Sequence, residues 1–125
     1  MRVLIDTHVM LWTLDRTDMV GKAAFDILAS PETRRVVSVV SLWEVAIKRR
    51  LGKLSAPEDL PAFLGARRNE ILVVGPDHVW RVGDLPPIHG DPFDRLLVAQ
   101  AQVEDIPIIT HDRILERYDV RIIRA

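Results

Sequence analysis

The 125-residue chain has 17 Lys and Arg against 18 Asp and Glu, a formal net charge of −1, and 48% hydrophobic residues. This composition is typical of a globular domain and argues against a disordered chain. The near-neutral charge excludes a strong whole-molecule attraction to nucleic acid, so any such binding must depend on a local basic patch. The chain has no cysteine, which excludes disulfides and thiolate chemistry.

Five short apolar runs predict β-strands at residues 3–5, 36–40, 71–74, 106–109 and 120–123. These runs are rich in Val and Ile, as is typical of parallel strands buried on both faces. Helical patterns lie between them, over residues 21–30, 41–53, 57–68, 91–105 and 112–118. Because strands alternate with helices, we expect a single three-layer α/β/α domain over residues 1–125 with right-handed crossovers.

The predicted helix starts have recognisable caps. Ser41 and Glu44 have the spacing of a capping box, and Pro57 suits a first helical position. Asp91 is the expected N-cap of the helix that contains "DPFDRLLVAQA", because Pro92 follows it. That assignment leaves Asp94 in the first turn of the helix, at its third position.

Four acids are predicted to gather at one edge of the sheet: Asp6, Glu44, Asp94 and Asp112. Each lies where a strand or loop turns into a helix, and ligand sites in such sheets form outside the carboxyl ends of the strands. The strand at residues 71–74 has no acid directly after it, so we expect it to lie away from the site. Each acid taken alone fits a helix cap, because acids are favoured at helix N-termini.

The joint pattern favours a shared role. Converging carboxylates repel one another, and a divalent cation removes that cost. Mg²⁺ prefers oxygen ligands, and ions held by carboxylates activate water in phosphodiester cleavage. The four acids therefore indicate a site for Mg²⁺ or Mn²⁺.

The segments "VLIDTH", "SLWEVAIK", "HGDPFDRLLVAQA" and "IITHD" resemble those of the PIN-domain ribonucleases, and most of all the VapC toxins of bacterial toxin-antitoxin pairs. The resemblance runs in order over essentially the whole chain. It implies a five-stranded parallel sheet and Mg²⁺- or Mn²⁺-dependent endonucleolytic cleavage of RNA. It also implies two partners, a second copy of the chain in a homodimer and an antitoxin that blocks the site.

The resemblance also assigns residues to roles. It makes the four acids the metal ligands, for catalysis as well as binding. The neighbouring hydroxyls that would orient them, or a metal-bound water, are those of Thr7, Ser41 and Thr110. Arg95, next to Asp94, is a candidate for phosphate contact or for a structural ion pair.

Other side chains have simpler interpretations. We expect His8, His89 and His111 to be loop or rim residues, since a zinc site normally needs three or four His and Cys ligands. The basic run at residues 48–50 is the best candidate for contact with an RNA backbone, although a solvated helix end explains it equally. The three tryptophans at positions 12, 43 and 80 are expected in the core or at a dimer interface.

Two other functions stay open at this point. A phosphotransfer domain would use Asp6 as its nucleophile, but the usual lysine near a late strand end is missing, because no lysine follows Lys53. A non-catalytic α/β binding module would use the acids only as caps. No apolar run reaches the roughly 18 residues needed to cross a bilayer, and the first ten residues lack signal-peptide features. We therefore expect a cytoplasmic protein with no membrane partner.

Overall fold

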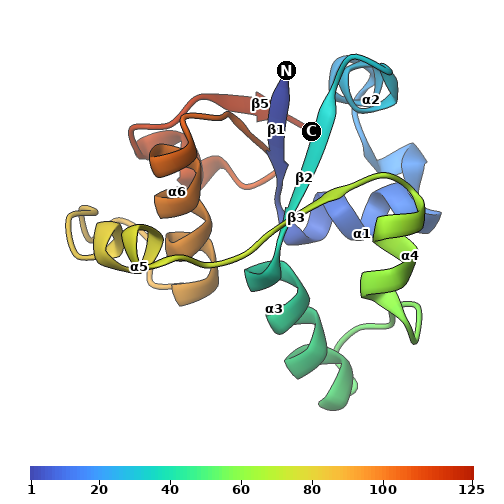
Figure 1. Ribbon diagram of the computed structural model, residues 1–125, viewed down its shortest axis with the longest axis horizontal. Coiled ribbons are helices and arrows are strands. Elements are labelled where there is room, and N and C mark those ends of the chain that lie inside the picture. The colour runs from blue at the N-terminus through green and yellow to red at the C-terminus, as the bar shows by residue number, and fades with distance from the viewer.

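The computed structural model describes residues 1–125 and contains five parallel strands that form one sheet. The strands are β1 (Arg2–Ile5), β2 (Arg34–Ser38), β3 (Glu70–Leu72), β4 (Ile108–Thr110) and β5 (Ile122–Arg124). Their order across the sheet is β3-β2-β1-β4-β5 (Figure 1). The predicted five-stranded parallel α/β fold is confirmed.

Six α-helices connect and cover the strands. They are α1 (Thr7–Asp15), α2 (Lys22–Ala29), α3 (Val39–Arg50), α4 (Leu60–Ala66), α5 (Pro76–Val82) and α6 (Pro92–Glu104). Two short 3₁₀ turns, Thr17–Met19 and Arg113–Arg117, complete the chain. No helix is long and apolar enough to cross a membrane.

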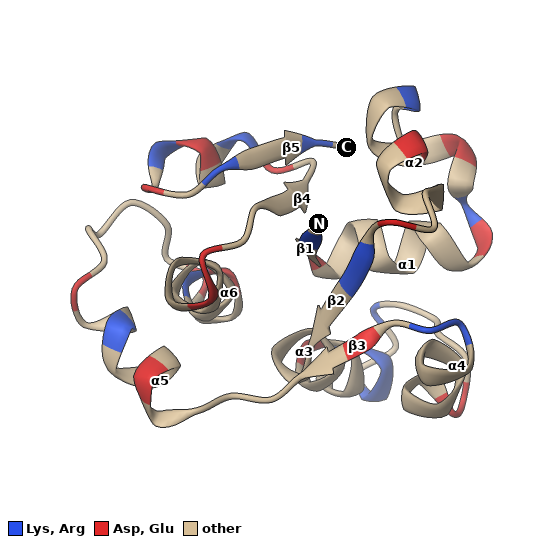
Figure 2. Ribbon diagram, turned by 45° about the horizontal axis from the view of Figure 1, so that its top comes forward, with Lys and Arg blue, Asp and Glu red and all other residues tan.

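The core lies in two halves, one on each face of the sheet. Successive strand residues point to opposite faces, so Val3 and Ile5 of β1 pack with α1, α2 and α4, whereas Leu4 packs on the other face with α6. Figure 2 shows the same division, with α5 and α6 on one face and α1, α2 and α4 on the other. The short strands are buried on both sides, which explains why their sequences read as unbroken apolar runs.

The predicted boundary between the second strand and its helix is wrong. The apolar run at residues 36–40 is not one strand, because β2 ends at Ser38 and α3 already begins at Val39. Ser38 is the N-cap, and its hydroxyl accepts a hydrogen bond of 3.0 Å from the Val40 backbone N–H. Ser41 and Glu44 therefore lie inside α3 and form no capping box. Periodicity cannot separate a buried strand from a buried first helical turn.

Two further helix predictions need correction. The fourth helix begins at Leu60, three residues after Pro57, with Pro61 in its first turn. Helix α5 was not predicted at all. Its Pro76 occupies the first helical turn after Gly75, which is a signal for a helix start.

The strand order changes direction at β1. From β1 the chain builds outward through β2 to β3, then returns to add β4 and β5 on the other side of β1. The carboxyl ends of β1 and β4 therefore flank the switch point, which is the usual ligand position in such sheets. Strand β3 lies at the far edge of the sheet, as predicted.

Candidate metal centre

Asp6 follows the last residue of β1 and serves as the N-cap of α1. Its Oδ1 accepts a hydrogen bond of 2.8 Å from the Val9 N–H, and its Oδ2 accepts one from the Thr110 hydroxyl. The residue is only 6% exposed. Burial raises the pKa of the Asp6 carboxyl, and the negative charge of Asp112 adds to that effect. Asp6 is thus both a helix cap and a member of a charged cluster.

The end of β4 brings Asp112 beside Asp6. The Thr110 hydroxyl that donates to Asp6 also accepts a hydrogen bond of 3.0 Å from the Asp112 N–H. Asp112 itself caps the 3₁₀ turn through its Oδ1, which lies 2.9 Å from the Ile114 N. A single hydroxyl therefore ties the ends of the two strands at the switch point.

Glu44 reaches the cluster from the second turn of α3. It is 3% exposed, and its Oε2 forms an ion pair with Lys48, one turn later. Its Oε1 is buried without any hydrogen-bond partner, which is costly for a charged oxygen. The Thr7 hydroxyl donates a hydrogen bond of 2.9 Å to the Ser41 hydroxyl and so fixes the start of α1 against α3.

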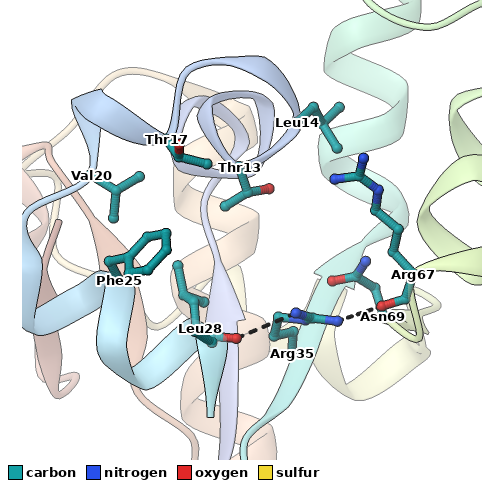
Figure 3. Close-up of a pocket in the computed structure, with 10 residues that line it drawn as sticks. Thr13, Leu14, Thr17, Val20, Phe25, Leu28, Arg35, Arg67 and Asn69 are labelled. Atoms are coloured by element: carbon teal, nitrogen blue, oxygen red, sulfur yellow. Dashed lines mark hydrogen bonds between the residues drawn. The ribbon is translucent and has the colours of Figure 1, made fainter. Parts of the chain in front are cut away.

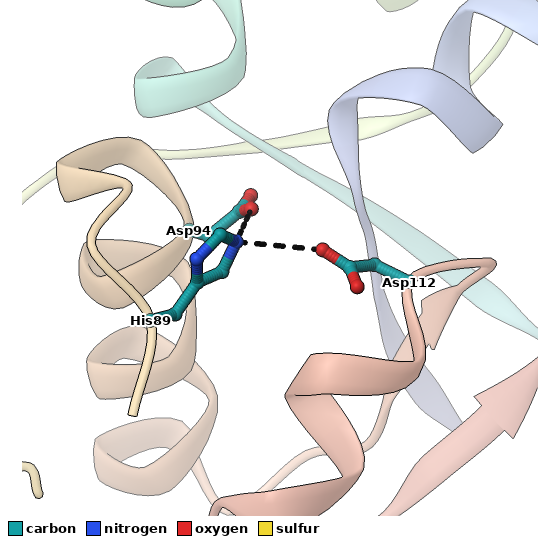
Figure 4. Close-up of side chains that lie close together, drawn as sticks. All are labelled: His89, Asp94 and Asp112. Carbon is teal, nitrogen blue, oxygen red and sulfur yellow. Dashed lines mark hydrogen bonds and ion pairs between the residues drawn. The ribbon is translucent and has the colours of Figure 1, made fainter. Parts of the chain in front are cut away.

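Helix α6 contributes Asp94 from its first turn. Asp91 is the N-cap, as predicted, because its Oδ1 accepts hydrogen bonds from the N–H groups of Phe93 and Asp94. The Asp94 side chain therefore does not cap the helix. It points toward the imidazole of His89, and its Oδ2 lies 2.9 Å from His89 Nε2. The same Nε2 lies 3.4 Å from Asp112 Oδ2 (Figure 4).

The electrostatics show that these acids crowd one another. The pKa of the Asp94 carboxyl is raised to about 7, first by burial and then by the negative charges of Asp91, Glu44 and Asp6. His89 acts in the opposite direction and lowers it. The cluster therefore contains more acids than the single lysine, Lys48, which pairs with Glu44.

The structure brings the four acids that the sequence singled out into this one cluster. It also adds two residues that sequence reasoning assigned elsewhere, His89 to the rim and Lys48 to a basic RNA-binding run. The spacing of Glu44 and Lys48 by four residues is a known ion-pair signal. The position of His89 has no comparable local signal, because it depends on the fold of the loop that precedes α6.

Arg95 forms no ion pair, which is one of the two roles that the sequence left open for it, and the phosphate contact stays a prediction. Its guanidinium instead donates to the backbone carbonyls of Pro86, Val82 and Leu85 and to the Tyr118 hydroxyl. Arg95 therefore fixes the loop that leads to His89.

Two pockets differ sharply in character. An open pocket of about 390 Å³ lies directly at the cluster and is lined by Asp6, His8, Trp12, His111, Asp112 and Arg113. A second pocket of about 170 Å³ lies between α1, α2 and α4 and is mainly apolar (Figure 3). In it, the Arg35 guanidinium donates to two backbone carbonyls, those of Leu28 and Arg67. Only the first pocket contains acids suited to metal chemistry.

The donor set fits a divalent cation. Carboxylate oxygens are the preferred ligands of Mg²⁺. The orphaned Oε1 of Glu44 and the raised pKa values of Asp6 and Asp94 are the features that a bound cation would relieve. Ligand atoms from His89, Asp94 and Asp112 all lie within 4.8 Å of one another.

Comparisons with known protein structures agree with this fold. The VapBC2 structure from Rickettsia felis, bound to promoter DNA, matches with a TM-score of 0.75 and 16% identity over 100% of this chain and 99% of that chain. The DNA-bound VapBC structure from Salmonella typhimurium matches with a TM-score of 0.70 and 20% identity, over 99% of this chain and 98% of that chain. The FitAcB structure from Neisseria gonorrhoeae matches with a TM-score of 0.65 and 16% identity, over 96% of this chain and 95% of that chain. These likenesses concern the fold.

No curated protein sequence matches the chain significantly. The family model of the PIN domain, however, matches residues 3–121, nearly the whole chain and all four acids of the cluster. The chain therefore belongs to the PIN domain family.

Proposed function

We propose that this protein is a metal-dependent endoribonuclease that uses Asp6, Glu44, Asp94 and Asp112 to hold Mg²⁺ or Mn²⁺. The observation that carries the proposal is the convergence of these four carboxylates at the switch point of the sheet. Two of them have raised pKa values and a third has an orphaned buried oxygen. A purely structural cluster gains nothing from such repulsion.

Residues around the cluster would hold the four acids in position. Thr110 orients Asp6 and the backbone of Asp112 through its one hydroxyl. The Thr7–Ser41 hydrogen bond keeps α3, and with it Glu44, against the start of α1. A divalent cation held by these acids supplies an activated water and charge stabilisation for the leaving oxygen in phosphodiester hydrolysis.

The surroundings of the cluster suit a phosphate backbone better than a small apolar ligand. The pocket contains Arg113 and two histidines, His8 and His111, beside the acids. Trp12, which packs edge-on against His111 with ring centroids 5.5 Å apart, lines the same pocket. Cationic groups and aromatic faces are the features by which proteins bind single-stranded nucleic acid. This local arrangement substitutes for the strong overall positive charge that the chain lacks.

The two other functions, a phosphotransfer domain and a non-catalytic binding module, explain fewer features of the acid cluster. A phosphotransfer domain needs an ionised and accessible nucleophile, whereas Asp6 is buried, has a raised pKa and accepts hydrogen bonds on both oxygens. A binding module with capping acids does not explain Glu44, which caps no helix and lies buried inside α3.

We further propose that the chain is the toxin of a toxin-antitoxin pair and forms a homodimer. The structural neighbours include a toxin-antitoxin complex from Klebsiella pneumoniae, matched with a TM-score of 0.58 and 18% identity over 88% of this chain. Trp43 and Ile47 on α3 and Leu51, its C-cap, are exposed and spaced four residues apart, so they form one apolar stripe. Trp80 on α5 is 85% exposed. Such patches are typical of protein interaction surfaces.

The nuclease proposal is tested by incubating the chain with a defined single-stranded RNA in Mg²⁺, in Mn²⁺ and in chelator. Cleavage should require the metal and fall by more than about 100-fold in Asp94→Asn, because the variant removes a ligand that no other group replaces. Asp59→Asn is the matched control. Asp59 is an exposed acid at the start of α4 that makes no side-chain capping bond, so this variant should cleave at the native rate. Equal loss in both variants would contradict the proposal.

The partner proposal has its own test. Sedimentation of the purified chain at micromolar concentration should give a dimer, and Trp43→Ser with Ile47→Ser should shift it toward monomer or abolish antitoxin binding. A native monomer that binds no antitoxin would refute this part alone.

A further inference from the structure

The imidazole of His89 contacts two acids of the cluster, Asp94 and Asp112. Its Nε2 lies 2.9 Å from Asp94 Oδ2 and 3.4 Å from Asp112 Oδ2. Figure 4 shows one ring nitrogen facing both carboxylates, of which one is carried by α6 and the other by the segment after β4. The other ring nitrogen points away from both acids.

The loop that holds His89 is fixed at both the backbone and the side-chain level. The His89 backbone N–H donates a hydrogen bond of 2.9 Å to the Tyr118 hydroxyl, and Arg95 donates to the same oxygen at 3.2 Å. Arg95 also donates to the Pro86 carbonyl at 2.8 Å. Tyr118 is itself buried in the core. The imidazole is therefore preorganised among the acids, because the contacts that hold its backbone come from buried or anchored groups.

The distances between these donor atoms suit a shared ion. With metal–ligand bonds of about 2.1 Å, neighbouring ligand atoms of an octahedron lie about 3 Å apart. The separations of His89 Nε2 from the two carboxylate oxygens, 2.9 and 3.4 Å, are of that size. Little movement is required for the nitrogen and both oxygens to face one cation.

A second observation points to a ligand at the same place. Glu44 Oε1 is buried without a partner, and the negative charge of Glu44 acts on Asp94. The cluster therefore contains an acceptor that no group of the protein satisfies.

We propose that His89 is a nitrogen ligand of the metal ion, shared with Asp94 and Asp112, and that it shifts the preference of the site from Mg²⁺ toward first-row transition ions such as Mn²⁺. This inference rests on the proposed metal site and adds a ligand to it. Mg²⁺ is a hard cation that favours oxygen donors, whereas an imidazole nitrogen favours transition metals. A site of carboxylates alone lacks the nitrogen donor that adds to the preference for transition metals.

The test measures the bound ion directly and does not depend on cleavage. Mn²⁺ is added to the purified chain, and pulsed electron paramagnetic resonance detects nitrogen-14 coupled to the bound ion. The native chain should show this coupling, and His89→Gln should lose it. Calorimetry on the same samples should show that His89→Gln weakens Mn²⁺ binding about 10- to 100-fold. Mg²⁺ binding should change by less than about threefold, because Mg²⁺ gains little from an imidazole.

His111→Gln is the matched control. His111 borders the same pocket but contacts Trp12 and the Ala125 carbonyl, not an acid, so its variant should keep the nitrogen coupling and the native Mn²⁺ affinity. If His89→Gln fails to fold, labelling the native chain with nitrogen-15 histidine should remove the nitrogen-14 signal, and His8→Gln and His111→Gln, which should both keep the coupling, identify His89 as its source.

The outcomes separate this inference from the function on which it rests. Mn²⁺ that binds without nitrogen coupling, or binds more tightly in His89→Gln, would refute His89 as a ligand and leave an all-carboxylate site intact. No Mn²⁺ binding in the native chain would refute both the ligand and the proposed metal site.

Discussion

Charged residues cluster at both ends of the sheet, but the pKa values of the acids are shifted in opposite directions at the two ends. At the amino ends of the strands, Arg2 lies 2.5 Å from a carboxylate oxygen of Glu70 and 3.5 Å from one of Glu104, and His78 Nε2 lies 3.1 Å from Glu104. Each acid there has a cation, and the pKa of Glu104 is lowered, chiefly by its hydrogen bond from His78. At the carboxyl ends, the pKa values of Asp6 and Asp94 are raised.

Helix α6 joins the two clusters, with Asp94 in its first turn and Glu104 at its last residue. The helix dipole would favour an acid at the first position and disfavour one at the last. The pKa directions are the reverse of that expectation. Neighbouring charges and burial therefore outweigh the dipole at both ends. The amino end has the balanced charges of a structural ion-pair network, and the carboxyl end has the excess negative charge that a cation would neutralise.

The largest expected effect concerns stabilisation by metal. At a Mn²⁺ concentration 100 times its dissociation constant, the native chain should gain about 2.7 kcal/mol in the free energy of unfolding. Asp94→Asn should gain almost nothing at the same concentration, whereas Glu104→Gln should gain as much as the native chain. Thermal unfolding with and without Mn²⁺ measures the difference. An equal gain in all three proteins would place the ion elsewhere.

The next effect concerns the hydroxyl that joins β1 and β4. Thr110→Val keeps the side-chain shape but leaves Asp6 Oδ2 without its hydrogen-bond donor and the Asp112 N–H without its acceptor. Loss of such an outer partner should weaken Mn²⁺ binding about 10- to 100-fold. Calorimetric titration measures this change, and native affinity in the variant would show that Thr110 does not position the acids.

A smaller effect concerns the pH dependence of stability in chelator. The native state holds the Asp94 proton up to a pKa of about 7, against 3.8 for an ordinary Asp carboxyl. The unfolded chain releases that proton first, so the free energy of unfolding falls as the pH rises from about 4 to about 7. Asn does not titrate, and Asp94→Asn should be more stable than the native chain by about 1–3 kcal/mol at pH 8.

That advantage of Asp94→Asn should be nearly absent at pH 4, where the native carboxyl is protonated. Denaturant unfolding at the two pH values gives the comparison. A variant that is less stable than the native chain at pH 8 would assign Asp94 a structural role instead.

The smallest effect lies at the other end of α6 and has the opposite sign. The lowered pKa of Glu104 means that its ionised form stabilises the native state above the ordinary carboxyl pKa of 4.5, and that this contribution is lost as the pH falls. Glu104→Gln should therefore lower the free energy of unfolding by about 1 kcal/mol at pH 7, as expected for a partly exposed ion pair. This loss of stability should become smaller as the pH falls below 4.5. A cost that does not change with pH would mean that packing, and not charge, explains it.

The sequence predicts the fold well because strands buried on both faces leave a direct signature. Short runs rich in Val and Ile at residues 3–5 and 106–109 identify the central strands, and the Asp91-Pro92 pair identifies the start of α6. It predicts the candidate acids because the carboxyl ends of parallel strands must share an edge of the sheet.

The rest could not be predicted because it depends on contacts between distant residues. The position of His89 beside Asp112 requires the fold of the loop that Tyr118 and Arg95 hold. The start of α3 at Val39 depends on Ser38, whose hydroxyl both caps the helix and contacts Gln100 across the core. Neither contact has a local sequence pattern.

The most direct test of the central claim is a crystal structure of the chain with Mn²⁺, with data collected to reveal the ion by its anomalous scattering. The account predicts one strong anomalous peak between Asp94 and Asp112, within ligand distance of both and near Asp6. A crystal with saturating Mn²⁺ that shows no peak at the carboxyl ends of β1 and β4, or a peak only at the Glu70 and Glu104 end, would contradict it.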